Sequence, residues 1–216
     1  MKYGTYLLLF FAVVILLALY AKQQESGGGS NESDNENLEQ IQAEKKRVAD
    51  SIYSSLAKEF AELEQKFIKR HDEFQEVDWY FPKSLRETNE VYVGGLEAHV
   101  NSKGYFYLTS TYNAQNWLFH EKMAIKCKGQ LYETQRVPTY NENNRTSSGS
   151  WGVSENVDYS NEISKEIAKA ISNSDTSKVL MRLEGREYYR DFTLTGLQKQ
   201  AVADAYRLQE LINQLK

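Results

Sequence analysis

The sequence is short of the residues that usually mark a redox, metal or lipidation site. Its 216 residues include one cysteine, Cys127, and three histidines, His71, His99 and His120. A single cysteine cannot close an intrachain disulfide, and this one lies too far from the N-terminus to be a lipidated N-terminal residue. No two histidines stand at a metal-ligand spacing. We therefore expect no metal site and no bound cofactor.

The sequence also has no excess of positive charge and no recognisable catalytic motif. The net charge is −4, so no basic field attracts nucleic acid, and no RNA-recognition, helix-turn-helix or zinc-finger signature occurs. Gly94-Gly95 lacks the Gly-Lys-Ser/Thr that completes a phosphate-binding loop. His120 and Cys127 suggest a dyad, but at seven residues apart on one regular strand they would face opposite sides of a sheet. No catalytic residue is predicted.

Tyrosine, by contrast, is plentiful, with 15 residues. Tyrosine offers sheets and interfaces a large contact area with a polar tip. The remaining composition, 41% hydrophobic and 26% charged, is typical of a globular protein. Together these features favour a β-rich domain that binds a partner.

The chain opens on an uncharged apolar run. Residues 3–21 carry no charge, and a helix needs about 20 apolar residues to cross a bilayer. A cleaved signal peptide is the alternative, but cleavage after Ala21 would leave Leu19 where a small residue is preferred. The run predicts an uncleaved signal-anchor in residues 1–21, single-pass in a bacterial cell membrane. The positive-inside rule then places the C-terminal part outside the cytoplasm.

Two further segments precede the expected domain. Residues 22–37 are rich in glycine, serine and acidic residues and predict a flexible linker. Residues 38–75 predict an amphipathic helix, because apolar side chains recur there at helical spacing. The stripe consists of Ile41, Val48, Ile52, Leu56, Phe60, Leu63, Phe67 and Phe74. The stripe either packs on the domain that follows or joins two copies weakly through residues 41–74, although its spacing is irregular for a coiled coil.

From Val77 the apolar period changes to two, which is typical of strands. Five segments read as strands: VDWYF, EVYVGGLEAHV, GYFYLTSTY, NWLFHEKMAIKCKG and QLYETQRV. Short turns between them, such as Lys128-Gly129-Gln130, favour antiparallel pairing. Pro138–Ser150 is polar and predicts a long exposed loop. The segment SNEISKEIAKAIS predicts a short helix with Ile163, Ile167 and Ile171 on one face.

The stretch VLMRLEGREYYRDFTLTGLQKQA, residues 179–201, predicts a hairpin followed by a helix. A two-residue turn at Gly185-Arg186 would place Leu183 opposite Tyr188 on the buried face. Arg182 and Tyr189 would then face each other on the exposed face as a cation–π pair. The motif Thr195-Gly196-Leu197-Gln198 fits a capping box that starts the last helix. The predicted fold class for residues 76–216 is α+β, with a mainly antiparallel sheet, a short helix and a C-terminal helix.

Several aromatic and glycine motifs resemble one family. DWYF (Asp78–Phe81), VYVGG (Val91–Gly95), NWLF (Asn116–Phe119), SWG (Ser150–Gly152) and VLMRLEGREYYRDFTLT are similar to those of an uncharacterised family of bacterial domains behind an N-terminal membrane anchor. The resemblance covers about residues 74–215. It implies a membrane-tethered α+β domain and no assigned activity.

Two functions remain open at this stage. The first is a non-catalytic, extracytoplasmic module that binds a protein or envelope component, with Arg182, Tyr189 and Trp151 as its candidate interaction surface. The second is a hydrolase-like envelope enzyme whose site is assembled across the sheet. A concave pocket with converging titratable groups would favour the enzyme, and an exposed aromatic surface would favour binding.

Overall fold

The structure is a computed structural model that describes residues 31–86, 93–174 and 177–216. The predicted anchor and the linker residues 22–30 lie outside these ranges. Among the described residues, no helix has the length and apolar character needed to cross a membrane. The chain divides into two units, residues 1–56 and 57–216. The second unit is an α+β domain built on two antiparallel sheets.

The N-terminal helix differs at both ends from the predicted segment 38–75. Helix α2 covers Asn31–Glu64, so it begins inside the predicted linker and ends before Phe67 and Phe74. Phe67 is the first residue of a strand and is buried, whereas Phe74 is fully exposed in a turn. The Asp72 carboxylate accepts hydrogen bonds from the backbone N–H groups of Phe74 and Gln75. Such a side-chain-stabilised turn offers the backbone an alternative to the helix.

The larger sheet has six strands in the order β1-β2-β3-β4-β8-β7, and all neighbours are antiparallel. Its strands are β1 (Phe67–Asp72), β2 (Val77–Pro82), β3 (Gly94–Asn101), β4 (Phe106–Ala114), β7 (Asn144–Gly149) and β8 (Gly152–Tyr159). Side chains alternate between its two faces. Leu96, Ala98 and Val100 of β3 point into the core, while Glu97 and His99 lie on the opposite face, here called the outer face.

The smaller sheet has four strands in the order β10-β9-β5-β6. Its strands are β5 (Lys122–Cys127), β6 (Gln130–Glu133), β9 (Val179–Glu184) and β10 (Tyr189–Thr193). The predicted tight turn between β5 and β6 is confirmed, because Cys127 pairs with Gln130 and both turn residues, Lys128 and Gly129, have positive φ. That pair of conformations is the type I′ turn that suits a two-residue hairpin.

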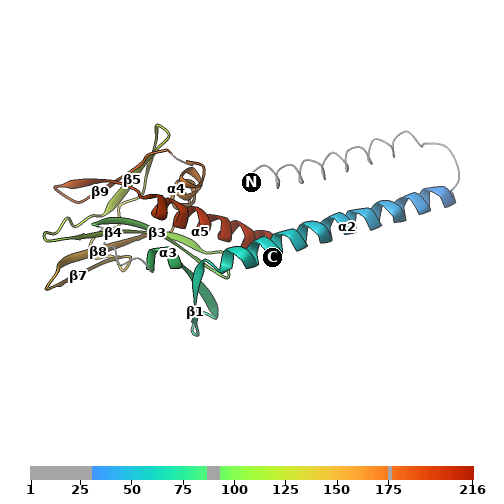
Figure 1. Ribbon diagram of the computed structural model, residues 1–216, viewed down its shortest axis with the longest axis horizontal. Coiled ribbons are helices and arrows are strands. Elements are labelled where there is room, and N and C mark those ends of the chain that lie inside the picture. The colour runs from blue at the N-terminus through green and yellow to red at the C-terminus, as the bar shows by residue number, and fades with distance from the viewer. Residues whose placement is uncertain (1–30, 87–92, 175–176) are drawn as a thin grey trace. The chain divides into compact units, whose positions relative to one another are not determined.

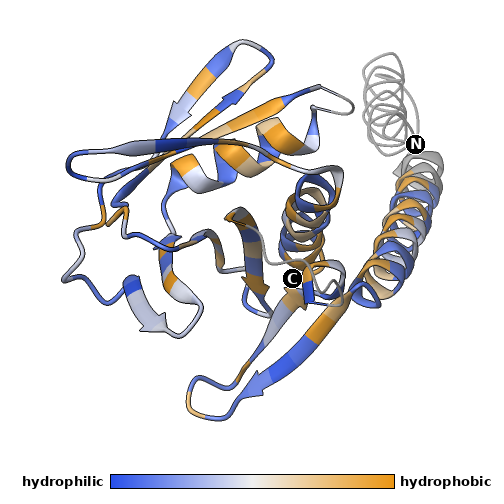
Figure 2. Ribbon diagram, turned by 60° about the vertical axis from the view of Figure 1, so that its left-hand side comes forward, coloured by the Kyte–Doolittle hydropathy of each residue, from blue (hydrophilic) through white to orange (hydrophobic). Residues whose placement is uncertain are grey.

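Helices fill the space between the two sheets (Figure 1). Helix α5 (Gly196–Gln214) covers the core side of β2 and β3, and α4 (Glu162–Ser172) packs on α5 and reaches both sheets. The short helix α3 covers Lys83–Arg86. Apolar and polar residues alternate along α4 and α5 (Figure 2), and the buried residues of α5 are mostly apolar: Ala201, Val202, Ala205, Leu208, Leu211 and Ile212. The predicted capping box at Thr195 is confirmed, with both reciprocal hydrogen bonds formed to Gln198. Ile167 and Ile171 of α4 are buried and Ile163 is half-buried.

Two segments of the predicted strand pattern are wrong. The expected loop Pro138–Ser150 ends in strand β7, which pairs with the following strand β8, so the irregular segment before the strand is limited to residues 138–143. The front of the segment NWLFHEKMAIKCKG is not a strand, since regular pairing begins only at Lys122. Strand β7 has the polar sequence NRTSSG, so no alternation marks it, and pairing with β8 supplies its order.

The hairpin β9–β10 is confirmed, but its register is shifted by two residues. Glu184 pairs with Tyr189 and Leu183 with Arg190, so the connection is four residues long instead of two. Tyr188 therefore lies in the turn and is 64% exposed, which contradicts its predicted burial, while Leu183 is fully buried. A shift by two keeps every strand side chain on its predicted face.

Gly185 is needed for packing space and not for a positive φ. A Cβ atom at this position would lie 2.1 Å from the carbonyl oxygen of Leu118. We expect Gly185→Ala to lower the free energy of unfolding by about 1–3 kcal/mol, the usual cost of overpacking. Gly149→Ala is the matched control, because nothing lies within 4 Å of a Cβ there. Urea unfolding of both variants makes the comparison, and equal costs would contradict the packing role.

Candidate functional site

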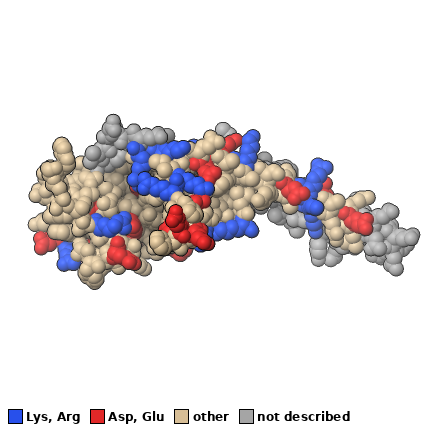
Figure 3. All heavy atoms as spheres, turned by 90° about the horizontal axis from the view of Figure 1, so that it is seen from below, with Lys and Arg blue, Asp and Glu red and all other residues tan. Residues whose placement is uncertain are grey.

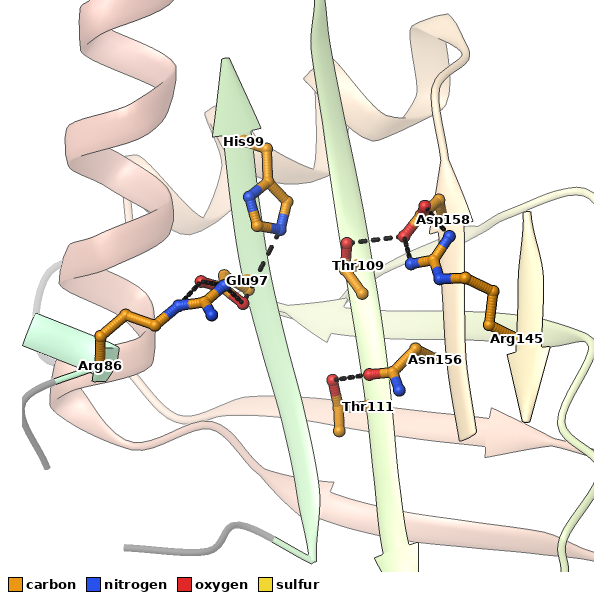
Figure 4. A network of polar contacts seen from close by, with 8 residues as sticks. All are labelled: Arg86, Glu97, His99, Thr109, Thr111, Arg145, Asn156 and Asp158. Carbon is orange, nitrogen blue, oxygen red and sulfur yellow. Dashed lines mark hydrogen bonds and ion pairs between the residues drawn. The ribbon is translucent and has the colours of Figure 1, made fainter. Parts of the chain in front are cut away.

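A polar network crosses the outer face of the six-stranded sheet (Figure 4). Thr109 of β4 donates a hydrogen bond of 2.7 Å to Asp158 of β8, and one step along the strands Thr111 donates one of 2.9 Å to Asn156. Glu97 of β3 pairs with Thr109 in the strand register. Antiparallel pairing thus brings these side chains, which are far apart in sequence, into adjacent rows on one face.

Two arginines bracket this network from its two sides. Arg86 of α3 donates to both oxygens of Glu97, at 3.1 and 3.3 Å. Arg145 of β7 donates to both oxygens of Asp158, at 2.5 and 3.0 Å. Their side chains are 44% and 54% exposed, while Glu97 and Asp158 are 20% and 14% exposed. Each guanidinium carries five donors, so both keep donors that face solvent.

Aromatic rings adjoin the polar network on the same face. His99 stacks on Tyr107 with ring centroids 4.6 Å apart and meets Phe81 edge-on at 5.2 Å. Trp79 makes edge contacts with Tyr107 and with Tyr105, whose side chain is 49% exposed. Burial raises the pKa of Tyr107 to about 12, so its hydroxyl stays a neutral donor. The outer face therefore combines rings with planar polar groups.

Burial controls the charge of two groups in this network. It lowers the pKa of His99 to about 4, and it raises the pKa of Glu97 against the opposing effect of Arg86. The His99 Nδ1 atom is buried and has no hydrogen-bond partner in the described structure. At neutral pH, His99 is thus an uncharged ring with one unused polar atom.

His99 should make the domain sensitive to mild acid. Its folded pKa lies below the unfolded value of 6.5, so the unfolded chain takes up the proton first and stability falls as pH drops from 6.5 toward 4. Between pH 7 and pH 5 we expect a loss of about 2 kcal/mol from this residue. His99→Phe keeps a ring in the stack and should remove that loss, as measured by urea unfolding at both pH values.

The control for this experiment is the exposed His71. His71→Gln should retain the full loss of stability between pH 7 and pH 5. If His99→Phe retained it as well, the buried His99 would not be its source.

A second polar cluster lies in the core, between the two sheets. Ser110 of β4 approaches His120 with Oγ 2.8 Å from Nε2, and His120 Nδ1 lies 3.0 Å from an Oε atom of Glu155 on β8. An ionised carboxylate only accepts, so His120 Nδ1 donates to Glu155, and in the neutral tautomer Nε2 accepts from the Ser110 hydroxyl. The order serine–histidine–acid is that of a hydrolase triad. All three residues, however, are 0% exposed.

Glu155 also holds the segment that passes from one sheet to the other. Its two oxygens accept the backbone N–H groups of Leu118, Phe119 and His120, at 2.6, 2.9 and 2.8 Å. Burial opposes its charge, but these hydrogen bonds and the one from His120 keep the pKa of Glu155 below its ordinary value. The core cluster therefore acts first as a clamp on residues 118–120.

The structure separates the three residues of the predicted interaction surface. Arg182 and Tyr189 are together on the four-stranded sheet, with the guanidinium 4.0 Å from the ring centroid, so the predicted cation–π contact is confirmed. Arg182 is also paired with both oxygens of Asp191. Trp151 is 92% exposed at the turn between β7 and β8 of the other sheet.

His120 and Cys127 were not expected to pair, and each has other partners. Cys127 is buried and donates to the Ala170 carbonyl oxygen at 3.5 Å, while His120 bonds Ser110 and Glu155, so the two do not form a dyad.

Figure 3 shows basic and acidic side chains lying beside one another over the domain.

Sequence reasoning missed both polar clusters. The outer face depends on β8, which was not recognised as a strand, although its period-two burial pattern is regular. That alternation, VSENVDY, is the one signal that could have placed Glu155 inward and Asn156 and Asp158 outward.

The chain matches no family model, no curated protein and no solved structure.

Proposed function

We propose that this chain is a membrane-tethered, non-catalytic binding module outside the bacterial cytoplasm, and that the outer face of its six-stranded sheet binds a hydroxyl-rich envelope component such as a glycan. The observation that carries the proposal is the juxtaposition of planar polar groups with aromatic rings on that face. Carboxylates, guanidinium groups and amides hydrogen-bond neighbouring hydroxyls in pairs, while rings pack on the C–H faces of sugars.

The charge state of the face suits a neutral polyol. Its two carboxylates are each matched by an arginine, Glu97 by Arg86 and Asp158 by Arg145. The two pairs themselves leave no net charge, and Arg70 of β1, over the Phe81 ring, adds a single positive group, so the face is close to neutral, which disfavours a strongly ionic ligand. The tether rests on the uncharged run of residues 3–21, and the resemblance to anchored bacterial domains agrees with it.

Sedimentation with purified cell-wall glycan tests the binding face. We expect the full chain in detergent to co-sediment with the glycan, and Arg145→Ala or Tyr105→Ala to weaken binding about tenfold, since each removes one exposed contact. Arg182→Ala on the other sheet is the control and should bind normally. Full binding by both outer-face variants would exclude this face.

The tether is tested separately with an external protease on intact cells. The body should be digested while a membrane-bound stub remains. A body that stays protected would reverse the proposed orientation, and a shortened soluble product would indicate cleavage of residues 1–21.

A serine hydrolase is the second candidate, favoured by Ser110, His120 and Glu155 alone. Because the Ser110 hydroxyl is buried, we expect no labelling by a fluorophosphonate probe in the native chain. Labelling that is lost in Ser110→Ala would establish the hydrolase and replace the binding module.

A further inference from the structure

Two exposed rings form a feature that the proposed function does not use. Trp117 and Phe119 stack with their ring planes 9° apart and their centroids 5.2 Å apart. They are 37% and 45% exposed. We call this pair the aromatic ledge. It lies in the segment that leads from β4 of the larger sheet to β5 of the smaller one, and it is not part of the outer face.

The backbone beneath the ledge is held rigidly in an unfavourable conformation. Phe119 has a φ of 51°, which is rare for a residue with a bulky side chain. The Glu155 carboxylate accepts the N–H groups on both sides of it and its own. From the other side, Gly185 lies against the carbonyl groups of Leu118 and Phe119, so closely that no Cβ would fit. Strain that is fixed in this way is typical of ligand-binding segments.

Two arginines are joined to the segment that carries the ledge through Glu121. Glu121, two residues beyond Phe119, is 7% exposed and accepts hydrogen bonds of 3.1 Å from both Arg136 and Arg186. Although burial opposes its charge, these arginines hold the pKa of Glu121 below its ordinary value. Arg186 follows Gly185 in the turn that packs on the ledge backbone. The two arginines are 51% and 62% exposed, and with one carboxylate between them they leave a net positive charge.

We propose that the aromatic ledge, with Arg136 and Arg186, is the docking site for an acidic peptide segment of a partner protein. An apolar side chain of the segment packs on Trp117 and Phe119, and a neighbouring carboxylate pairs with the free guanidinium donors. Trp and Arg are the residues that most often dominate the binding energy of protein interfaces. Bidentate pairing with a carboxylate is the geometry that guanidinium groups favour.

The chemistry favours a peptide over the alternatives. A basic segment would be repelled by the two arginines. A simple polyanion would gain from the arginines but would leave the ledge without a partner. A peptide that carries both an acidic and an apolar side chain satisfies both parts of the site at once.

Fluorescence anisotropy with three synthetic peptides tests the proposal on the full chain in detergent. One peptide alternates aspartate with leucine, the second replaces aspartate by lysine, and the third replaces leucine by serine. We expect only the first to bind measurably. Trp117→Ala should weaken it at least about tenfold, as a central contact does. Arg186→Ala should weaken it less and reduce its dependence on salt.

Exposed residues of the helix α2 provide the controls. Tyr53→Ala and Arg47→Ala remove an exposed ring and an exposed guanidinium from elsewhere, and both should bind the first peptide normally. A thermal melt confirms that each variant is folded. The proposal is overturned if the first peptide does not bind, if the lysine peptide binds equally, or if Trp117→Ala has no effect on binding. It is also overturned if the site prefers a simple polyanion. In that case inorganic polyphosphate would displace the peptide in an Arg186-dependent way and would bind Trp117→Ala as tightly as the wild type. None of the variants alters the outer face, so the result is independent of glycan binding.

Discussion

Glu155→Gln should destabilise the domain by about 3 kcal/mol or more, the usual cost of breaking a buried charged network. The wild-type carboxylate accepts from three backbone N–H groups and from His120, with no exposure to water. A glutamine has the same size but turns one acceptor into a donor. At least one buried N–H would then face another N–H without a partner, which is costly in the core. Urea unfolding at neutral pH measures the loss.

The matched control is Glu133→Gln. Glu133 is 48% exposed and bonds Lys122 at the surface, so its loss should cost at most about 1 kcal/mol. Equal costs for the two variants would show that the buried carboxylate contributes nothing beyond a surface pair.

The pH dependence of Glu155 follows from the same contacts. Its folded pKa lies below the unfolded value of 4.5, so the stability that it contributes is present above that value and is lost as pH falls through the folded pKa. Glu155→Gln should therefore lose less stability than the wild type on acidification below pH 4.5. A parallel loss in both proteins would place the acid sensitivity in other carboxylates.

Leu183→Ala should lower the free energy of unfolding by about 2–5 kcal/mol, as truncation of a buried leucine does. Leu183 is 0% exposed on β9 and pairs with Met123 of β5, which is also 0% exposed. Its removal leaves a cavity at the centre of the smaller sheet. Calorimetric or urea unfolding measures the effect.

Tyr188 provides the control for Leu183, because the two were expected to face each other. Tyr188 lies in the turn and is 64% exposed, so Tyr188→Ala should change stability by about 0.5 kcal/mol or less. A large cost for Tyr188→Ala together with a small one for Leu183→Ala would indicate the two-residue turn instead of the observed register.

The sequence determined the elements whose signals are local. The turn at Lys128-Gly129 and the capping box at Thr195 each depend on a few adjacent residues. The faces of β9 and α5 follow from periods of two and 3.6 residues. For the same reason the hairpin register could shift by two residues without moving any strand side chain to the other face.

Only the tertiary structure decided the strands and sites whose signals are not local. The residues of β1 continue the helical spacing of apolar residues seen in α2, so the sequence predicted a helix there. Pairing with β2, which begins with Phe67 opposite Pro82, makes them a strand. Strand β7 is polar and is ordered by β8. Glu155 stands 35 residues from His120, and Asp158 stands 49 residues from Thr109. No spacing rule joins such residues, because strand pairing between distant segments sets which side chains meet. The sequence thus specified the alternation of strands such as β8 and β9, and the order of the strands in the sheets created the outer face, the core cluster and the aromatic ledge.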